Sequence, residues 1–176
     1  MRTLAEREAL FRAWWQEHRG IVVKVARSFA PADADAADLQ QELLLQLWLS
    51  LPTFAGQAKA STWIYRVCLN TALTWRRGNR RRERRLDPAA DVMRMPSADA
   101  TPADRTADRE MLEKLYASIR LMSDFDRALV LLALDGLAYR EIAEITGLTE
   151  NHVGVALTRA RRRLAALMKG VTDERE

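Results

Sequence analysis

The strongest constraint on the fold of this chain is a pair of amphipathic segments joined by a glycine-containing corner, in residues 136–169. Apolar residues recur at helical spacing from about Ala138 to Thr146, which predicts a short first helix. Gly147 can end that helix because glycine adopts positive φ without strain. Thr149 can then cap a second helix by accepting a hydrogen bond from a backbone N–H near His152. This order of elements is the helix-turn-helix pattern.

The predicted second helix has two chemically different faces. One face is apolar and consists of Val153, Ala156, Leu157, Ala160, Leu164 and Leu167. Four arginines crowd the remaining surface: Arg159, Arg161, Arg162 and Arg163. A basic helical face is often only solvated, but phosphate neutralisation is a common role of such a face beside a helix-turn-helix corner. The hairpin therefore favours DNA binding over a plain structural role.

Composition supports a polyanionic partner. The formal net charge is +4 and the isoelectric point is near 9.6. The positive excess is local, because residues 76–85 contain seven arginines and one glutamate. Such a concentration of positive charge favours association with nucleic acid.

Enzymatic chemistry finds little support in the sequence. Cys68 is the only cysteine, and His18 and His152 lie far apart, so no metal site and no disulfide framework are expected. The chain has no Ser/His/Asp set and no glycine-rich phosphate loop. We therefore expect no catalytic residues, no cofactor and no small-molecule substrate. Because no apolar run approaches the ~20 residues of a membrane span and no secretory signal opens the chain, we also expect no membrane insertion and a cytoplasmic location.

Sparse glycine and the scarcity of alternating β-branched runs predict an all-α fold. Four helices are expected in the first half. The first two span about 4–18 and 21–29, separated by a break at Gly20 and stopped by Pro31. The third runs from a cap at Asp33 or Asp35 to about Leu51. The fourth runs from Ser61 or Thr62 through the arginine run. The adjacent Trp14 and Trp15 are expected in the core. Further helices are expected over 107–121 and, with Ser123 as cap, over 124–135.

Residues 86–106 read as a flexible linker. Three of the five prolines lie here, among Ala, Asp, Ser and Thr. Fully extended, ~20 residues reach ~70 Å, which is about two turns of B-DNA. The sequence thus predicts two small helical domains, residues 1–85 and 107–170, in either a compact or an extended arrangement.

The predicted helix after Ser61 mixes aromatic, amide, hydroxyl and basic side chains. These are Trp63, Tyr65, Arg66, Asn70, Thr74 and Arg77. Rings stack on bases, amides read base edges and arginines hold phosphates, so the mixture suits single-stranded nucleic acid. Some of these aromatic residues could equally belong to the core.

Three blocks, in this order, resemble bacterial RNA polymerase sigma factors of the extracytoplasmic-function (ECF) type, the minimal sigma-70 relatives. The first block is DAADLQQEL at 35–43, followed by Leu47-Trp48. It is similar to the family's acidic DAEDLVQE…LW helix, which docks on the clamp helices of the polymerase β′ subunit. The resemblance implies polymerase-binding roles for Asp35, Asp38, Leu39, Gln41 and Glu42. On spacing alone, Asp35 and Asp38 suit helix capping and the helix dipole, and Ala37 lacks the family's usual acid.

The second block is similar to the family's FRG…TWLYRIARN segment, which melts and holds the −10 promoter element with one base flipped into a pocket. The resemblance implies −10 contacts for Phe54, Lys59, Ser61, Thr62, Trp63, Tyr65, Arg66, Asn70, Arg76 and Arg77. Asn70 matches the residue that lines the pocket. Residues 57–60 depart from the usual pattern, which leaves the identity of the captured base open.

The third block is the helix-turn-helix, similar to the family's GLSYEEIAEILGIS…TVKSRLHRARKRL. In relatives it binds the −35 element as duplex. The implied contacts are Arg140, Glu141, Thr149, Glu150, Asn151, His152, Val155, Arg159, Arg161 and Arg162. Gly154-Val155-Ala156 stands where relatives often carry Lys-Ser-Arg, and Gly154 costs a helix ~1 kcal/mol relative to Ala. The sequence offers no reason for this glycine.

The resemblance implies a four-helix sigma-2-like domain, a linker and a sigma-4-like domain. It also implies the partners: core RNA polymerase through the β′ clamp helices and the β flap, promoter DNA, and an anti-sigma factor. Two alternatives stay open. A stand-alone helix-turn-helix regulator would use only residues 136–169, and a helical adaptor would use the arginine runs merely as solvated faces.

Overall fold

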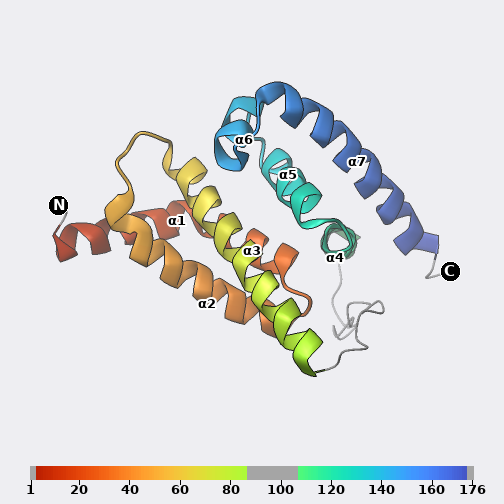
Figure 1. The fold of residues 1–176 in the computed structure, drawn as a ribbon, viewed down its shortest axis with the longest axis horizontal. Coiled ribbons are helices and arrows are strands. Elements are labelled where there is room, and N and C mark those ends of the chain that lie inside the picture. The colour runs from red at the N-terminus through yellow and green to blue at the C-terminus, as the bar shows by residue number, and fades with distance from the viewer. Residues whose placement is uncertain (1–2, 87–106, 174–176) are drawn as a thin grey trace.

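The computed structural model describes residues 3–86 and 107–173, and both ranges are helical without strands. The first range holds α1 (Leu4–Phe29), α2 (Asp33–Ser50), a 3₁₀ helix η1 (Leu51–Thr53) and α3 (Ala60–Leu86). The second holds α4 (Ala107–Arg120), α5 (Asp124–Leu134), α6 (Tyr139–Thr146) and α7 (Glu150–Asp173) (Figure 1). The predicted all-α class is confirmed for these residues. Apart from Leu86, the predicted linker lies outside them.

The predicted helix break at Gly20 is wrong, because α1 is one continuous helix of 26 residues. Its buried residues include Ile21, Val25 and Phe29, which follow one another every four residues and form a continuous stripe against the core. Burying such a stripe stabilises a helix by several kcal/mol, which outweighs the ~1 kcal/mol cost of one interior glycine. The first half therefore has three α-helices and one 3₁₀ helix where four helices were predicted.

The predicted capping of the next helix is also wrong. Its N-cap is Ala32, and no side chain caps it, so Asp33 and Asp35 lie within the first turn. There the Asp35 carboxylate still lies near the positive end of the helix dipole. The predicted end is confirmed, since the helix gives way at Leu51 to the 3₁₀ helix that contains Pro52.

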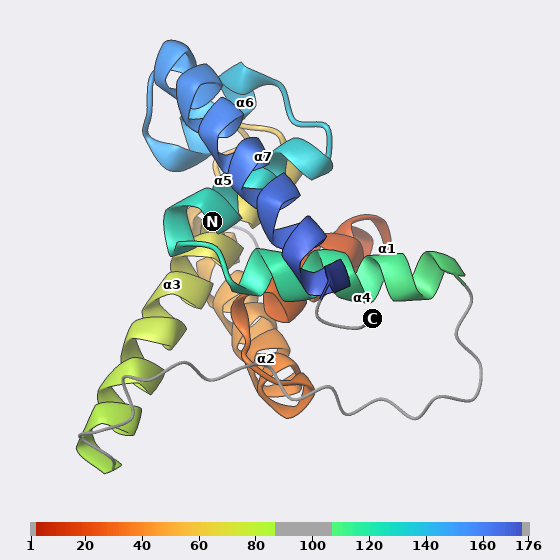
Figure 2. The same cartoon turned by 90° about the vertical axis from the view of Figure 1, so that its right-hand side faces the viewer.

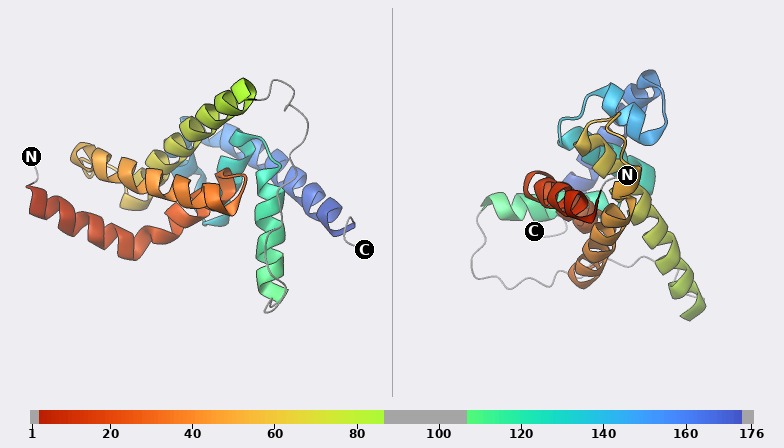
Figure 3. Two further views of the ribbon diagram at one scale, coloured as in Figure 1. Left: turned by 90° about the horizontal axis from the view of Figure 1, so that it is seen from below. Right: turned by 90° about the vertical axis from the view of Figure 1, so that its left-hand side faces the viewer.

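The helices form two groups that pack against each other. Helices α1, α2 and α3 contact one another, and α4, α5 and α6 all contact α7. The groups meet where α1 contacts α4 and α5, and where α3 contacts α6. Figure 2 shows the second group covering one side of α1 and α3, with the C-terminal end of α3 extending away from the other helices. The right-hand view of Figure 3 shows the same extension of α3 from the opposite side. One cluster of buried apolar residues runs through both groups.

Candidate nucleic-acid interface

The helix-turn-helix has the predicted geometry. The N-cap of α6 is Ala138, whose backbone N–H donates to the Glu141 carboxylate over 2.9 Å. Gly147 ends the helix in the left-handed region, at φ 76°. The Thr149 hydroxyl accepts a hydrogen bond of 3.3 Å from the His152 backbone N–H. The corner is thus fixed by local hydrogen bonds and by one glycine with positive φ.

The helix after the corner divides cleanly into a buried and an exposed face. Val153, Ala156, Leu157, Ala160 and Leu164 are all buried. Across the whole helix-turn-helix, the exposed residues include nearly all of those expected to contact −35 DNA: Arg140, Thr149, Glu150, Asn151, His152, Val155, Arg159, Arg161 and Arg162. Asn151, Val155 and Arg162 follow one another at helical spacing and so share a face. Val155 is an apolar side chain that is 53 % exposed on this face.

Gly154 now has a physical explanation. A Cβ at this position would lie 3.4 Å from Cε2 of Tyr139, which is the first residue of α6. The missing side chain therefore lets the Tyr139 ring lie directly against α7. The longer side chain that relatives often carry here would have to share this space with the ring.

Among the contacts between described residues, Glu141 is the one expected −35 residue that binds the first group of helices. Lys59, an expected −10 residue, donates from Nζ to Oε1 of Glu141 over 2.7 Å. This hydrogen bond, together with the one from Ala138, lowers the pKa of Glu141, and the same contact raises the pKa of Lys59. Groups expected to meet two different promoter elements thus bind each other.

The expected −10 residues of α3 fall into an exposed and an occupied set. Arg66, Asn70 and Arg77 are exposed and lie four and seven residues apart, on one side of the helix. Thr62 and Tyr65 are each only 1 % exposed. Tyr65 donates from its hydroxyl to Oδ2 of Asp135, and burial is the main reason that its pKa is raised.

Two of the exposed or half-exposed arginines also have partners in the second group of helices. Arg66 donates to the backbone carbonyl of Glu144 over 2.5 Å. Arg76 forms an ion pair with Asp124. The structure therefore places several expected −10 residues against α5 and α6.

The aromatic residues before and within α3 form a cluster with Trp14. Ring centroids lie 4.9 Å apart for Trp14 and Phe54, 5.3 Å for Trp14 and Trp63, and 5.5 Å for Phe54 and Trp63. Trp14 is buried, as predicted, while Phe54 and Trp63 are half-buried. The cluster anchors the segment between η1 and α3 on α1 and leaves Phe54 and Trp63 partly accessible.

The acidic face of α2 differs from expectation at one position. Asp38 and Gln41 are exposed, and Asp35 and Glu42 are half-buried. Leu39 is fully buried in the core, which corrects the expectation that it contacts another protein directly. It anchors the helix from which the polar residues project.

Sequence reasoning missed two exposed leucines on this face. Leu45 and Leu49 are 49 % and 56 % exposed and follow Asp38 and Gln41 at helical spacing. The signal was present in the sequence, because neither leucine lies on the four-residue repeat of Leu39, Leu43 and Leu47, which is buried in the core. Together these residues form a surface with an acidic start and an apolar continuation.

Sequence reasoning also missed a set of charged residues on the second group of helices. Asp135 binds Lys24 as well as Tyr65, and Glu113 binds Arg27 over 2.8 Å. The partners are 70 to 111 residues apart in the chain, so no local pattern could have indicated them.

Other site types find no support in the described ranges. Residues 3–86 and 107–173 contain no group of three or more His, Cys, Asp or Glu that could bind a metal ion. In the same ranges, no helix has both the length and the apolar character needed to cross a membrane.

Each of the two groups of helices matches a known protein-family region. Residues 14–82 match Sigma-70 region 2, and residues 112–164 match Sigma-70 region 4. The first match covers most of α1 to α3, and the second covers the helix-turn-helix and most of the helices before it.

Individual relatives agree with these matches. The chain is 31 % identical to the ECF RNA polymerase sigma factor SigG of Mycobacterium tuberculosis, over 96 % of this chain and 51 % of the relative. It is 28 % identical to the ECF RNA polymerase sigma-E factor of Escherichia coli K12, over 80 % of this chain and 76 % of the relative. The chain thus spans about half the length of the mycobacterial relative.

Two solved structures share the fold. CnrH in complex with the cytosolic domain of CnrY superposes with a TM-score of 0.64 at 22 % identity, covering 93 % of this chain and 90 % of that one. The sigma factor RpoE of Bartonella quintana, in complex with the anti-sigma factor NepR, also superposes with a TM-score of 0.64 at 22 % identity. That superposition covers 90 % of this chain and 98 % of the other.

The fold and the site define an all-helical protein with a helix-turn-helix in its second half and a basic, aromatic helix at the end of its first half. The chain belongs to the sigma-70 family, in its ECF group.

Proposed function

We propose that this chain is an ECF sigma factor that binds core RNA polymerase and directs promoter-specific transcription initiation. The proposal rests mainly on one observation. The residues that match the family's three functional blocks project outward at several positions on α2, α3 and α7, while the residues between them fill the core. We assign residues 1–85 and 107–170 to the two working domains and residues 86–106 to the connection. The role is one of binding rather than catalysis.

The polymerase-binding surface in this proposal is the outer face of α2. Asp38 and Gln41 are its exposed polar residues, with Asp35 and Glu42 beside them, and Leu45 and Leu49 extend it. The partner is the pair of β′ clamp helices, and α4 to α7 would meet the β flap. Leu39 contributes by holding the helix in the core. Because the polymerase is cytoplasmic, the protein acts in the cytoplasm.

The −10 surface in this proposal runs along α3. Arg66 and Arg77 would hold phosphates of the melted strand, and Asn70 would read the edge of a flipped base. Around them lie Phe54, Lys59, Ser61, Thr62, Trp63, Tyr65 and Arg76. The rings of Phe54 and Trp63 offer stacking surfaces worth ~1–3 kcal/mol per base.

The −35 surface is the exposed face of the helix-turn-helix. Arg159, Arg161 and Arg162 suit phosphate contacts, which give affinity without sequence preference. Asn151 and Val155 suit base readout, because an amide can pair with adenine and an apolar side chain can pack on a thymine methyl group.

An anti-sigma factor is a further proposed partner. One solved structure of similar fold contains the anti-sigma factor NepR, and the other contains the cytosolic domain of CnrY. An anti-sigma factor would compete for the outer faces of α2, α3 and α7, on which both polymerase and DNA binding depend.

In-vitro transcription tests the proposal. Core polymerase and this protein are incubated with a promoter library, and the 5′ ends of the transcripts are sequenced. Discrete start sites with shared −35 and −10 elements are expected. Binding to intact duplex with no polymerase-dependent transcripts would instead indicate a stand-alone regulator, and no DNA binding at all would indicate an adaptor.

A matched pair of variants tests the base-reading residue. Asn70→Ala should abolish the preference for one −10 base, whereas Asn79→Ala, the same chemical change on the same helix, should preserve it. Loss of a buried contact to a flipped base is expected to cost ~1–3 kcal/mol, which corresponds to about fivefold to 150-fold in promoter preference. Equal effects of the two variants would contradict the role of Asn70.

A further inference from the structure

Within the part of the chain that the structure describes, the two groups of helices meet through ion pairs of one polarity. In each of these pairs, the cation comes from the α1–α3 group and the carboxylate from the α4–α7 group. The pairs are Lys24 with Asp135, Arg27 with Glu113, Lys59 with Glu141, and Arg76 with Asp124. Arg80 also approaches Asp124, at 3.8 Å. A surface suited to a polyanion is thus covered by an acidic surface of the same chain.

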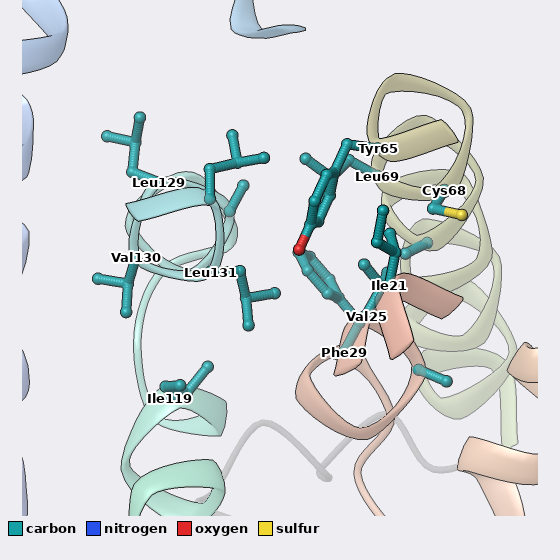
Figure 4. Close-up of a cluster of buried hydrophobic side chains, with 14 of the residues drawn as sticks. Ile21, Val25, Phe29, Tyr65, Cys68, Leu69, Ile119, Leu129, Val130 and Leu131 are labelled. Atoms are coloured by element: carbon teal, nitrogen blue, oxygen red, sulfur yellow. The ribbon is translucent and has the colours of Figure 1, made fainter. Parts of the chain in front are cut away.

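The centre of this contact is apolar. Figure 4 shows Phe29 and Tyr65 on one side, with Ile119 and Leu131 opposite them. All four are at most 4 % exposed. The Arg127 guanidinium, from α5, lies 5.1 Å from the centroid of the Phe29 ring. An apolar centre with a charged rim is the usual anatomy of a specific protein interface.

Asp135 connects the centre to the rim. One of its carboxylate oxygens accepts from Lys24 and the other from the Tyr65 hydroxyl, so a single residue of the second group holds two helices of the first. Its side chain is only 19 % exposed, and that of Lys24 is 36 % exposed. A charge pair screened from solvent in this way contributes more than a pair on the open surface, such as Lys59 with Glu141.

The contacts occupy groups that single-stranded DNA would need. Tyr65 is buried beneath Asp135, Arg66 binds the Glu144 carbonyl, and Arg76 binds the Asp124 carboxylate. In each case a carbonyl or carboxylate oxygen holds a donor that would otherwise be available to a phosphate or a base.

We propose that the α4–α7 group has a second function as an intramolecular competitor of the −10 strand. In this closed state its acidic surface occupies the part of the −10 surface formed by Lys59, Tyr65, Arg66 and Arg76, and the groups must separate before the melted strand can bind along the whole surface. This inference rests on the proposed function of α3. It assigns Asp135 as the residue that contributes most to closure.

The first test uses the wild-type full chain and detects the closed state directly. A carbodiimide links a lysine amine to a carboxylate in contact with it, so Lys24–Asp135 and Lys59–Glu141 cross-links are expected by mass spectrometry of the free protein. Adding core polymerase should reduce both. Absence of both cross-links from the free, folded protein would overturn the proposal.

The second test measures competition with DNA. Asp135→Arg places a cation opposite Lys24 and removes the acceptor of Tyr65. Its affinity for a fluorescein-labelled, mixed-sequence 20-nucleotide single strand is measured by anisotropy. Because apparent affinity scales with the fraction of competent molecules, about tenfold tighter binding is expected if the wild type is mostly closed. Glu110→Arg makes the same charge change at an exposed position of α4 and serves as the control.

Two further variants separate closure from misfolding. Lys24→Asp in the Asp135→Lys background exchanges the charges of the pair and should bring affinity back toward the wild-type value. Tyr65→Phe keeps the ring and should give a smaller gain in affinity. If Asp135→Arg and Glu110→Arg bind the single strand equally, the proposal is overturned. In-vitro transcription by the wild-type protein separates this outcome from a failure of the proposed sigma-factor function. If the wild type initiates transcription while Asp135→Arg and Glu110→Arg bind equally, only the closed state is refuted.

Discussion

The hydroxyl of Tyr65 donates a hydrogen bond to Oδ2 of Asp135, 70 residues further along the chain, while Oδ1 of the same carboxylate accepts from Lys24. The phenol is 1 % exposed, so it has no water to replace this acceptor. The bond joins α3 to the end of α5 and explains how one acidic residue positions two helices of the other group.

Tyr65→Phe should lower the free energy of unfolding by about 1–2 kcal/mol, because it removes a hydrogen bond to a charged acceptor that Lys24 still partly satisfies. Urea denaturation measures the change. Tyr139→Phe, on a side chain that is 42 % exposed, is the control and should alter stability by less than ~0.5 kcal/mol. Equal losses for the two variants would contradict the importance of the Tyr65 bond.

The same bond predicts a dependence on pH. Burial, together with the hydrogen bond to Asp135, raises the pKa of Tyr65 above its ordinary value near 10. The unfolded chain then loses this proton first, so the stabilisation is complete below pH ~10 and declines as the pH rises further. Urea midpoints at pH 8 and 10.5 should fall less in Tyr65→Phe than in the wild type. A parallel fall in the two proteins would argue against this assignment.

Arg127 should be a major determinant of stability. It is 2 % exposed, and its guanidinium donates to the carbonyls of Ile119, Arg120 and Met122 over 3.1, 2.5 and 3.0 Å. Burial lowers its pKa to about 9, so the group stays charged at neutral pH. Arg127→Met should cost about 3 kcal/mol, because the carbonyls at the end of α4 lose their donors.

Arg127→Lys is the matched variant for this prediction. Lysine keeps the charge but lacks the planar fork, so it can satisfy fewer of the carbonyls and should give an intermediate loss. Thermal unfolding followed by circular dichroism ranks the three proteins. A lysine variant as unstable as the methionine variant would mean that the fork geometry, not the charge, stabilises this site.

Cys68 should be chemically silent in the folded protein. The side chain is fully buried, and burial raises the pKa of its thiol to about 12. Since the thiolate is the reactive form, a thiol reagent at pH 8 should label the native protein only as fast as the structure opens, and the denatured protein at once. Rapid labelling of the native protein would show that the interior of α3 is accessible.

Whether a feature of the fold could be predicted from the sequence depends on how far apart in the chain the residues that determine it lie. The corner at Gly147 and the caps at Thr149 and Ser123 were predicted and are confirmed, because each depends on residues within one turn. The break at Gly20 was predicted wrongly, because packing of the whole α1 stripe overrides a local propensity.

The candidate nucleic-acid interface was only partly predictable, because some of its features also depend on residues far apart in the chain. The exposed face of α7 follows from helical periodicity alone. The burial of Tyr65 does not, because it depends on Asp135, which local patterning cannot connect to α3. Leu39 was misplaced since a motif match does not distinguish a residue that contacts a partner from one that anchors the motif.

The two glycines of the helix-turn-helix should respond oppositely to alanine. At Gly147, φ is 76° and no atom beyond its two chain neighbours lies within 4 Å of the added Cβ, so Gly147→Ala should cost about 1–2 kcal/mol through backbone strain alone. At Gly154 the backbone is helical, and alanine should gain up to ~1 kcal/mol in helix propensity. That gain is reduced by the contact of the new Cβ with Tyr139 at 3.4 Å.

Gly78→Ala isolates the contribution of that contact. Gly78 also lies in a helix, but apart from its chain neighbours and the nearby helix backbone no atom lies within 4 Å of its added Cβ, so it should show the propensity gain alone. Urea denaturation of the three variants is expected to give a gain for Gly78→Ala, a smaller gain for Gly154→Ala and a loss for Gly147→Ala. A loss at Gly154 comparable to that at Gly147 would mean that the Tyr139 ring cannot move. Gly154 would then be required by the fit between α6 and α7, because the close approach of the ring would exclude any side chain at that position.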